Sequence, residues 1–357
     1  MIGEETIVSL FERKRHRWRL TIAALSIALT LAIFFMTLVG SMGPIGPSGG
    51  ERIPLQAALD ILFGESENWP ENFRAIIMDI RLPRILLGVL VGCSLAVSGA
   101  VMQGVFKNPM ADPYIIGLSA GAAVGASAST FLPLKQDIGM YALPLMAFIG
   151  ATSTVFLVYQ IAKSRGRTRV ETLLLSGIAV GSFLAAVTSF LLYLSGQQFR
   201  FLFFWLLGGL WMASWKVVWI VFPVISIGTV LLQLFARDLN AMLLGEEQAT
   251  HLGIDVKKVE KILLALTSLV AGTAVAFSGI IGFVGLIIPH MMRIRVGPNH
   301  TLLLPASTLA GGLFLASVDT VARTIIAPTE IPVGVLTALC GAPFFAYLLR
   351  KSRRVWL

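Results

Sequence analysis

Residues 81–127 read RLPRILLGVLVGCSLAVSGAVMQGVFKNPMADPYIIGLSAGAAVGAS. The stretch begins with two arginines around Leu82-Pro83 and continues as an apolar run of about 20 residues, the length that crosses a bilayer. It then turns at 108–113, NPMADP, and ends in a run of small residues. Two prolines prevent a continuous helix at the turn, and Asn and Asp favour turns. The order predicts two membrane-spanning helices joined by a short polar turn.

The composition of the whole chain agrees with a membrane protein. Hydrophobic residues make up 56% of it and charged residues 13%, whereas a soluble domain carries about 25% charged residues. Its mean hydropathy is +0.82. We therefore predict an all-α integral membrane protein, a single transmembrane domain over residues 1–357, in the cell (inner or plasma) membrane. The net charge of +9 indicates basic cytoplasmic loops rather than nucleic-acid binding.

Ten apolar segments are predicted to cross the membrane. The region 262–292 needs a break, because as one helix it would be about 46 Å long, against a hydrocarbon core of about 30 Å. Ser278-Gly279 and Gly282 offer that break. The ten segments are 20–40, 82–104, 115–134, 141–162, 172–194, 214–236, 262–280, 282–294, 302–322 and 331–350.

Charge sets the expected orientation. Ten crossings place both basic termini on one side, and 20 of the 28 Lys and Arg residues then fall on that side. Because cytoplasmic loops are enriched in Lys and Arg, we expect both termini to be cytoplasmic. The basic N-terminus 1–19 and the loop 237–261 are then inside, and the loop 41–80 is outside. The short, Gly-broken segment 196–213 is predicted to be interfacial or re-entrant on the outer side.

Small residues follow one face of the third predicted span. Gly117, Gly121 and Gly125 recur at a spacing of four, with alanines between them. Lipid provides no hydrophobic drive between helices, so association depends on close backbone approach. The pattern predicts a helix-packing face, and a wall of a translocation path is the alternative.

Arg81 and Arg84 stand at the expected outer start of the second span. Arginines there face an unfavourable helix dipole, and Arg forms bidentate pairs with carboxylates. They therefore suggest a docking site for an acidic partner, with snorkelling to lipid headgroups as the alternative. Arg323, at the outer end of the ninth span, is a third candidate, although Asp319 lies four residues earlier and could pair with it.

Two features are expected on the cytoplasmic side. Asn108 and Met110 in the turn 108–113 could form a gate, or belong to a simple turn. Within 237–261, short amphipathic helices are predicted from Ala241 to Leu252, punctuated by Gly245 and Gly253. Four apolar residues would otherwise face water there, which favours a docking platform for a cytoplasmic protein over a solvated loop. They are Leu243, Leu244, Ala249 and Leu252.

The sequence lacks the motifs that several other functions require. The chain contains no G-x-x-x-x-G-K-[ST] phosphate loop, so we expect no ATP hydrolysis by this subunit. The four histidines are scattered and the two cysteines have no ligand spacing, so no metal site is expected. Few ionisable residues lie deep in the spans, which argues against an ion-coupled transporter and favours energy from a partner. An ion-coupled secondary transporter or channel for a small solute remains the alternative.

Seven motifs in order carry a resemblance to a known family. Over residues 75–350 the chain resembles the FecCD/BtuC-type permeases of type II ABC importers for iron siderophores, heme and cobalamin. The motifs are RLPR (81–84), SGAVMQGVFKNPMADP (98–113), LLLSGIA (173–179), WLLGGL (205–210), LGEEQATHLGID (244–255), SGIIGFVGLIIPHMMR (278–293) and EIPVGVLTALCGAPFFAYLL (330–349).

The resemblance implies an architecture and a set of partners. It implies ten helices per subunit and a homodimer with one pathway at the two-fold axis. A cytoplasmic ATPase dimer that binds ATP and Mg would sit below, and an extracytoplasmic substrate-binding protein would dock above. This chain would hold no cofactor. It would contact membrane lipid and the metal-chelate substrate, and bind no nucleic acid.

The same resemblance implies roles for individual residues. Arg81, Arg84 and Arg323 match arginines that pair with glutamates of the binding protein. Asn108 and Met110 match a cytoplasmic gate, although the family usually has Leu where Met110 stands. The implied ATPase-coupling residues are Leu244, Gly245, Glu246, Glu247, Ala249, Leu252 and Gly253.

Transport is expected to proceed by ATP-driven alternating access. The resemblance implies that specificity for the cargo is held mainly by the binding protein. Ferric siderophore is the first expectation, heme and cobalamin are next, and a small oxyanion is last.

Overall fold

The computed structural model describes residues 4–39, 53–64, 68–133, 138–164, 167–168 and 170–352. Within these ranges the chain is almost entirely helical, apart from a small antiparallel pair of strands, β1 (Lys163–Ser164) and β2 (Arg167–Thr168). Residues 1–3 of the basic N-terminus, and residues 41–52 and 65–67 of the expected external loop, lie outside the described residues.

Seven helices among the described residues are long and apolar enough to cross a membrane. One of them, Glu71–Val105, is a continuous helix built from α3 (Glu71–Arg74), a π-helical segment (Ala75–Arg81) and α4 (Leu82–Val105). The others lie within α1 (Glu4–Leu38), α7 (Ala142–Ala162), α8 (Val170–Leu194), α10 (Trp215–Leu234), α13 (Val256–Ser278) and α15 (His300–Thr324).

Shorter helices complete the described fold. Three of them, α5 (Leu118–Ala128), α14 (Val284–Val296) and α16 (Val333–Ser352), fall on the remaining predicted spans, so each of the ten predicted segments overlaps one helix. The others connect the long helices. They are α2 (Leu55–Phe63), α9 (Phe199–Leu206), α11 (Ala236–Met242) and α12 (Glu246–His251).

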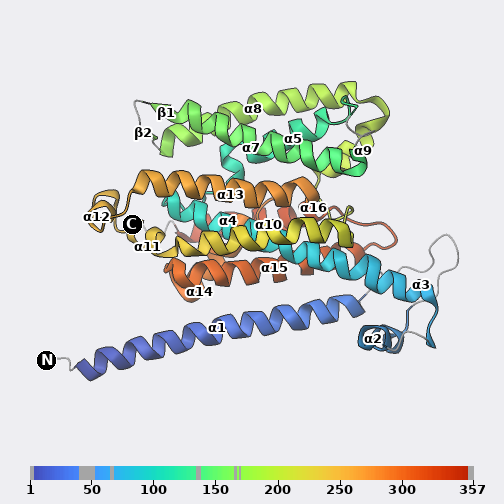
Figure 1. The fold of residues 1–357 in the computed structure, drawn as a ribbon, viewed down its shortest axis with the longest axis horizontal. Helices are drawn as coiled ribbons and strands as arrows, with labels where there is room; N and C mark the ends of the chain where they lie inside the picture. The colour runs from blue at the N-terminus through green and yellow to red at the C-terminus, as the bar shows by residue number, and fades with distance from the viewer. Residues whose placement is uncertain are drawn as a thin grey trace.

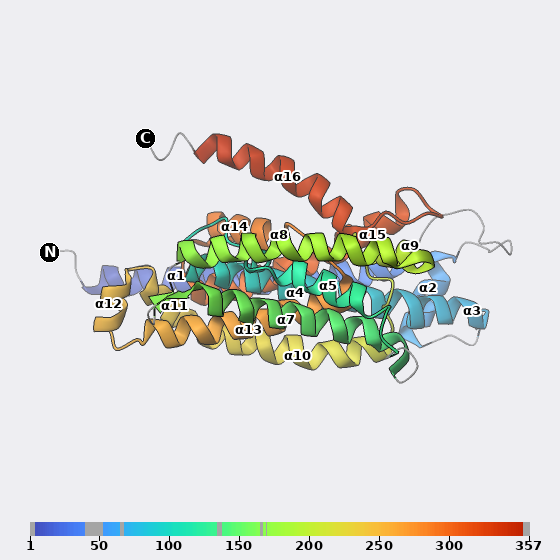
Figure 2. The same ribbon diagram turned by 90° about the horizontal axis from the view of Figure 1, so that it is seen from above.

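Helix α4 is the centre of the bundle. It packs against α10, α13, α14 and α15, and most of its side chains are buried. Figure 1 shows α5, α7 and α8 on one side of α4, α10 and α13. Helices α14 and α15 lie on the other side, with α1 beyond them. Helix α16 runs away from the bundle, as Figure 2 shows.

Close backbone contact explains why these helices carry so many small residues. A Cβ atom on Gly92 of α4 would collide with the backbone of Gly311 in α15. A Cβ atom on Gly121 of α5 would likewise collide with the backbone of Gly150 in α7, and one on Gly125 with the backbone of Met146. The prediction that the 117/121/125 stripe is a packing face is confirmed, as expected where lipid supplies no hydrophobic drive between helices.

Two predicted boundaries were wrong. The span expected over 115–134 contains only the 11-residue α5, about 16 Å long, because Gly117 adopts a left-handed conformation with φ of 84° and separates it from the preceding turn. The span expected to start at residue 82 begins at Glu71. Arg81 and Arg84 therefore lie inside a continuous helix, and the argument from an unfavourable N-terminal dipole does not apply to them.

The expected break in the region 262–292 is confirmed. Helix α13 ends at Ser278 and α14 begins at Val284, with Gly279 and Phe283 both at positive φ between them. The segment 196–213 contains a 3-10 turn (Gly196–Gln198) and the short helix α9, followed by Gly208 at positive φ.

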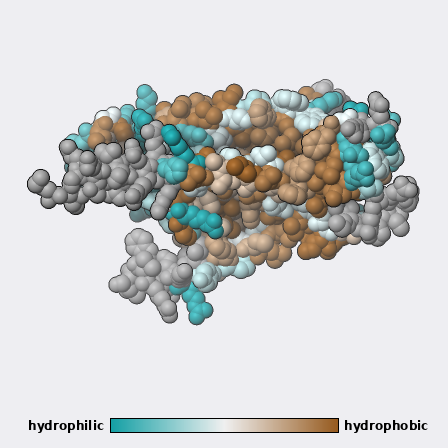
Figure 3. Space-filling model, turned by 90° about the horizontal axis from the view of Figure 1, so that it is seen from below, coloured by the Kyte–Doolittle hydropathy of each residue, from teal (hydrophilic) through white to brown (hydrophobic). Residues whose placement is uncertain are grey.

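The two ends of the bundle differ in content. Helices α11 and α12 lie at the end where α1 begins and α16 ends, which we call the α12 end. Helices α2, α3 and α9 lie at the opposite end, the α3 end (Figures 1 and 2). On the face in Figure 3, hydrophobic residues dominate the middle of the bundle and hydrophilic residues gather towards its ends, which is the pattern of a protein that spans a bilayer.

Candidate functional site

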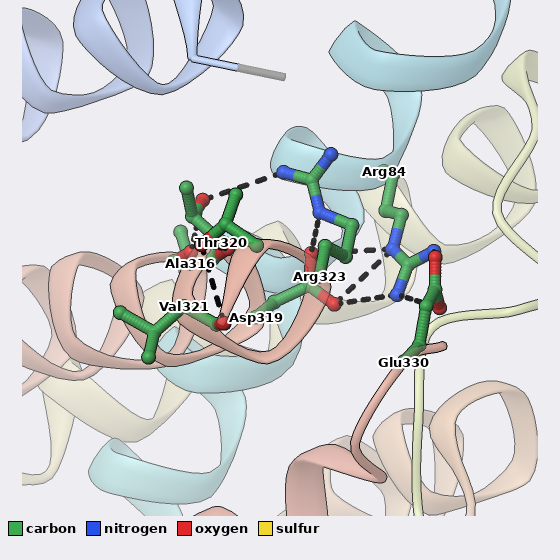
Figure 4. Close-up of polar contacts among 8 residues, drawn as sticks. Arg84, Ala316, Asp319, Thr320, Val321, Arg323 and Glu330 are labelled. Atoms are coloured by element: carbon green, nitrogen blue, oxygen red, sulfur yellow. Dashed lines mark hydrogen bonds and ion pairs between the residues drawn. The ribbon is translucent and has the colours of Figure 1, made fainter. Parts of the chain in front are cut away.

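A cluster of four charges, three of them buried and one partly exposed, lies towards the α3 end. Arg84 of α4 donates hydrogen bonds through Nη2 to Asp319 Oδ1 of α15 at 2.9 Å and to Glu330 Oε2 at 2.9 Å. Its Nη1 donates to Glu330 Oε1 at 3.0 Å, and its Nε to Asp319 Oδ1 at 3.1 Å. Figure 4 shows this guanidinium held between the two carboxylates. We call Arg84, Asp319, Arg323 and Glu330 the charge cluster.

Arg323 completes the cluster from the opposite side of Asp319 (Figure 4). Its Nε lies 3.1 Å from Asp319 Oδ2, an ion pair without hydrogen-bond geometry, and its Nη2 lies 3.4 Å from Thr320 Oγ1. The intrahelical pair that we considered as the alternative for Arg323 is therefore present. Two positive and two negative side chains balance the cluster, as the burial of charge requires.

The three predicted docking arginines are not equally accessible. The side chains of Arg84 and Arg323 are only 11% and 7% exposed, and both are paired with carboxylates of the chain itself. Arg81 is partly buried, and it donates one hydrogen bond at 3.3 Å to the backbone oxygen of Thr37 in α1. Among the described contacts, Arg81 has no carboxylate partner. It is the arginine of the three that retains capacity for an external carboxylate.

The sequence did not indicate Glu330 or the pairing of Arg84 with Asp319. One signal was available, since Asp319 lies inside an apolar span, and ionisable residues in such positions pair with one another or face a cavity. The spacing of four between Asp319 and Arg323 indicated one possible pair. Arg84 lies 235 positions from Asp319, so the sequence alone gave no sign that these two residues pair.

The predicted gate residues lie in the turn after α4, at the α12 end. Asn108 Oδ1 accepts a hydrogen bond from the backbone N–H of Met110 at 2.9 Å, and its own N–H donates to Gln103 O at 3.1 Å. The Asn108 side chain thus builds the turn itself. Met110 in this turn is 38% exposed.

The rest of this turn contacts the break between α13 and α14. The Tyr114 hydroxyl donates to Ile281 O at 3.0 Å, and Asp112 Oδ1 accepts from the Tyr114 N–H at 2.8 Å. Burial raises the pKa of Asp112 to about 6, although that hydrogen bond opposes the shift. The turn that follows α4 at the α12 end is thereby joined to the break between α13 and α14.

The predicted coupling segment forms two short helices, α11 and α12. Leu244 and Leu252 are 66% and 64% exposed, and Glu246, Glu247 and Gly253 are exposed as well. Gly245, which precedes α12, is partly buried with φ of 127°.

Ala249 does not belong to this exposed surface. It is fully buried and packs with Met242 and Val256 in a small core between α11, α12 and α13. The expectation that it faces water was wrong, because α12 turns its Ala249 side inward and presents its glutamates and Leu252 outward.

Two hollows lie among the described helices. A cleft of about 1120 Å³ at the α12 end is lined by side chains of both charges, among them Lys163, Lys261, Glu171 and Glu246. An apolar groove of about 590 Å³ lies between α16 and the α13–α14 break. No group of three or more His, Cys, Asp or Glu residues that could hold a metal ion occurs in the part of the chain that the structure describes.

The family model of the FecCD transport family matches residues 31–351. The chain belongs to the FecCD transport family. The expected family is therefore confirmed, and this FecCD permease is a multi-pass protein of the cell membrane, in keeping with its apolar helices.

Named relatives of this FecCD permease transport different cargoes. It is 53% identical over 281 residues to the cobalamin import system permease protein BtuC of Halobacterium salinarum, covering 79% of this chain and 75% of that protein. It is 41% identical to the hemin transport system permease protein HmuU of Yersinia pestis, covering 77% and 83%. It is 39% identical to the Fe(3+) dicitrate transport system permease protein FecD of Escherichia coli, covering 78% and 86%.

A solved structure has the same fold. It is a metal-chelate type ABC transporter in an inward-facing conformation, 31% identical in sequence. The alignment covers 92% of this chain and 98% of the other, with a TM-score of 0.76.

The charge cluster of this FecCD permease predicts unequal effects of two arginine substitutions. Arg84→Gln leaves Asp319 and Glu330 without their shared partner, and breaking a buried ion pair costs about 3–5 kcal/mol. Arg81→Gln removes one hydrogen bond to a backbone oxygen and costs about 1 kcal/mol. Thermal unfolding of the purified protein in detergent measures both, and equal losses of stability would contradict a structural role for Arg84.

Proposed function

We propose that this chain is the membrane subunit of a binding-protein-dependent ABC importer for a metal chelate. Two copies form one pathway, and separate ATPase subunits drive it by alternating access. The observation that carries the proposal is the coupling segment, where Leu244 and Leu252 stand exposed beside Glu246 and Glu247. Exposed apolar residues rimmed by charge at the end of a membrane bundle mark a protein-docking surface.

We propose ten crossings with both termini in the cytoplasm. The excess of Lys and Arg on one side supports this orientation. The start of α1 and the end of α16 lie with α12 at one end of the bundle, which agrees with an even number of crossings (Figures 1 and 2). On this orientation the α12 end is cytoplasmic and the α3 end is extracytoplasmic.

The divergence of α16 supports a homodimer. Leu339 and Tyr347 are 65% and 60% exposed on a helix that leaves the bundle. The apolar groove beside it is lined by residues such as Ile280, Phe283 and Leu339. A second copy would cover this surface, and the pathway would run between the two copies.

Energy would come from the partner subunits. ATP and Mg would bind to the ATPase dimer below the α12 end, and this chain would hold no cofactor and perform no catalysis. Closure of the ATPase dimer would move α11 and α12. The turn carrying Asn108 and Met110 would then act as the cytoplasmic gate.

We propose that the binding protein docks at the α3 end with Arg81 as the principal cation. Arg84 and Arg323 lie near it, but an incoming carboxylate would have to replace Asp319 or Glu330 to reach them. Since such an exchange gives up buried pairs that already exist, these two arginines support docking mainly by holding α4 and α15 in place.

For the cargo we propose cobalamin first. The relative that transports cobalamin is 53% identical, whereas the relatives that transport hemin and ferric dicitrate are 41% and 39% identical. This changes the order given by the sequence alone, in which ferric siderophore came first. Siderophore and heme are the other outcomes of the test below.

Reconstituted transport tests the function and the cargo together. Proteoliposomes containing this permease and its ATPase are expected to take up cyanocobalamin when the binding protein and ATP are present, and not with a non-hydrolysable analogue. Uptake of hemin, ferric citrate or a ferric hydroxamate instead would change the cargo and keep the mechanism. Uptake driven by an ion gradient without the ATPase would instead support a secondary transporter.

Disruption of the coupling segment tests the partner below. Leu252→Glu places a charge in the proposed interface, and we expect the ATPase to be lost from the purified complex, because a buried unpaired charge costs several kcal/mol. Lys258→Glu, an exposed change at the same end, is the control and should retain the ATPase. Normal assembly of the Leu252→Glu variant would reject the coupling role.

Charge reversal at the α3 end tests the partner above. Arg81→Glu should weaken binding-protein affinity about tenfold at low salt, with a smaller effect at high salt, because exposed charges are screened there. Arg200→Glu, an exposed cation of α9 at the same end, is the matched control. If Arg81→Glu binds the binding protein as tightly as the parent and as Arg200→Glu do, the docking role of Arg81 is excluded.

A further inference from the structure

A polar junction at the α12 end joins α11 to the first turn of α15. Asn240 Oδ1 accepts a hydrogen bond from the His300 backbone N–H at 2.7 Å and lies 3.2 Å from His300 Nδ1. The Asn240 amide donates to Asn299 Oδ1 at 3.0 Å and lies 3.3 Å from Thr301 Oγ1. One side chain of α11 is therefore hydrogen-bonded to three consecutive residues, 299–301, at the start of α15.

The His300 ring continues from this junction to α4. Because Asn240 Oδ1 only accepts hydrogen bonds, His300 Nδ1 carries the proton. The opposite nitrogen, Nε2, is buried without a hydrogen-bond partner. It faces Gly104 of α4, where an added Cβ atom would lie 2.6 Å from Nε2 and 3.2 Å from Cε1. Packing against bare backbone, and not a hydrogen bond, sets the position of this edge of the ring.

Gly104 leads directly into the gate turn. The Lys107 N–H donates to Gly104 O at 3.3 Å, and the Asn108 N–H donates to Gln103 O at 3.1 Å. The Gln103 side chain also donates to Gly285 O and Leu286 O of α14, at 3.2 and 3.3 Å. These hydrogen bonds tie Gly104 and its neighbour Gln103 to Lys107 and Asn108, where the gate turn begins.

We propose that His300 is a positioning residue that transmits movement of α11 to the gate turn through its contact with Gly104. The inference rests on the proposed function, since it assigns a route between the coupling segment and the gate. Close-packed interiors transmit displacement because they are hard to compress. The route starts at Asn240, passes through the His300 ring, and ends at the turn that follows Gly104.

The test measures the accessibility of the gate turn and does not require the transported cargo. Met110→Cys, in a background with Cys93 and Cys340 replaced by Ser, is labelled with a membrane-impermeant maleimide in the complex with its ATPase. The labelling rate is measured with and without ATP plus vanadate. The ratio of the two rates reports how far the gate responds to the nucleotide.

Two single variants should each weaken this response. Gly104→Ala places a Cβ against the ring, and His300→Asn retains a donor to Asn240 while removing the ring edge that contacts Gly104. We expect each to reduce the nucleotide response about fivefold or more, the lower end of coupling between linked sites. Combined, they should recover the response to within about twofold, since residues in contact are non-additive.

The control is Gly272→Ala in α13, whose Cβ would lie in ordinary contact, 3.6 Å from Phe148. It should leave the nucleotide response unchanged. If Gly104→Ala does not fold, His300→Asn decides alone, because it opens space instead of creating a clash.

The possible failures are distinguishable. A full response in both single variants, or losses that add in the double variant, overturns the route through His300 and leaves the proposed function standing. An absent response in the parent protein, with the ATPase still bound, overturns the proposed gate and this inference with it.

Discussion

The bundle depends on the pairing of Arg84 with Asp319 and Glu330. These three residues come from α4, from α15 and from the segment before α16; Arg84 and Asp319 are buried together with Arg323, and Glu330 is 33% exposed. Each charge is tolerated there only because the others are present. The cluster consequently sets the spacing between the central helix and the two C-terminal helices towards the α3 end, while α16 is free to diverge beyond Glu330.

Away from this cluster, the helices are held together by close backbone packing and not by paired charges. Gly92 against Gly311, and Gly121 against Gly150, let helix backbones touch, which is how helices associate where lipid is as apolar as the side chains. At the α12 end, Gly104 also lacks a side chain, and this leaves room for the His300 ring instead of for another helix backbone. Helix α4 therefore carries a group of paired charges towards the α3 end, and a close contact between Gly104 and the His300 ring at the α12 end.

The sequence anticipated much of this arrangement and missed specific parts of it. The ten apolar segments, the break near Gly279 and the packing stripe at Gly121 were predictable because hydropathy, glycine and spacing act locally. The length of α5 and the start of the second span were not, because Gly117 and the segment 71–81 depend on what surrounds them. The inward side of Ala249 depended likewise on the packing of α12 against its neighbours.

By itself, the sequence determined the membrane class, the family, the places of the arginines, the turn at 108–113 and the short helices within 237–261, because composition and motifs are properties of the chain alone. Only the tertiary structure decided which arginines are occupied by internal carboxylates, and that Asn240, His300 and Gly104 meet. The physical reason is distance along the chain: Arg84 and Asp319 are 235 positions apart, and Asn240 and His300 are 60 apart. Contacts of that range exist only once the helices have packed.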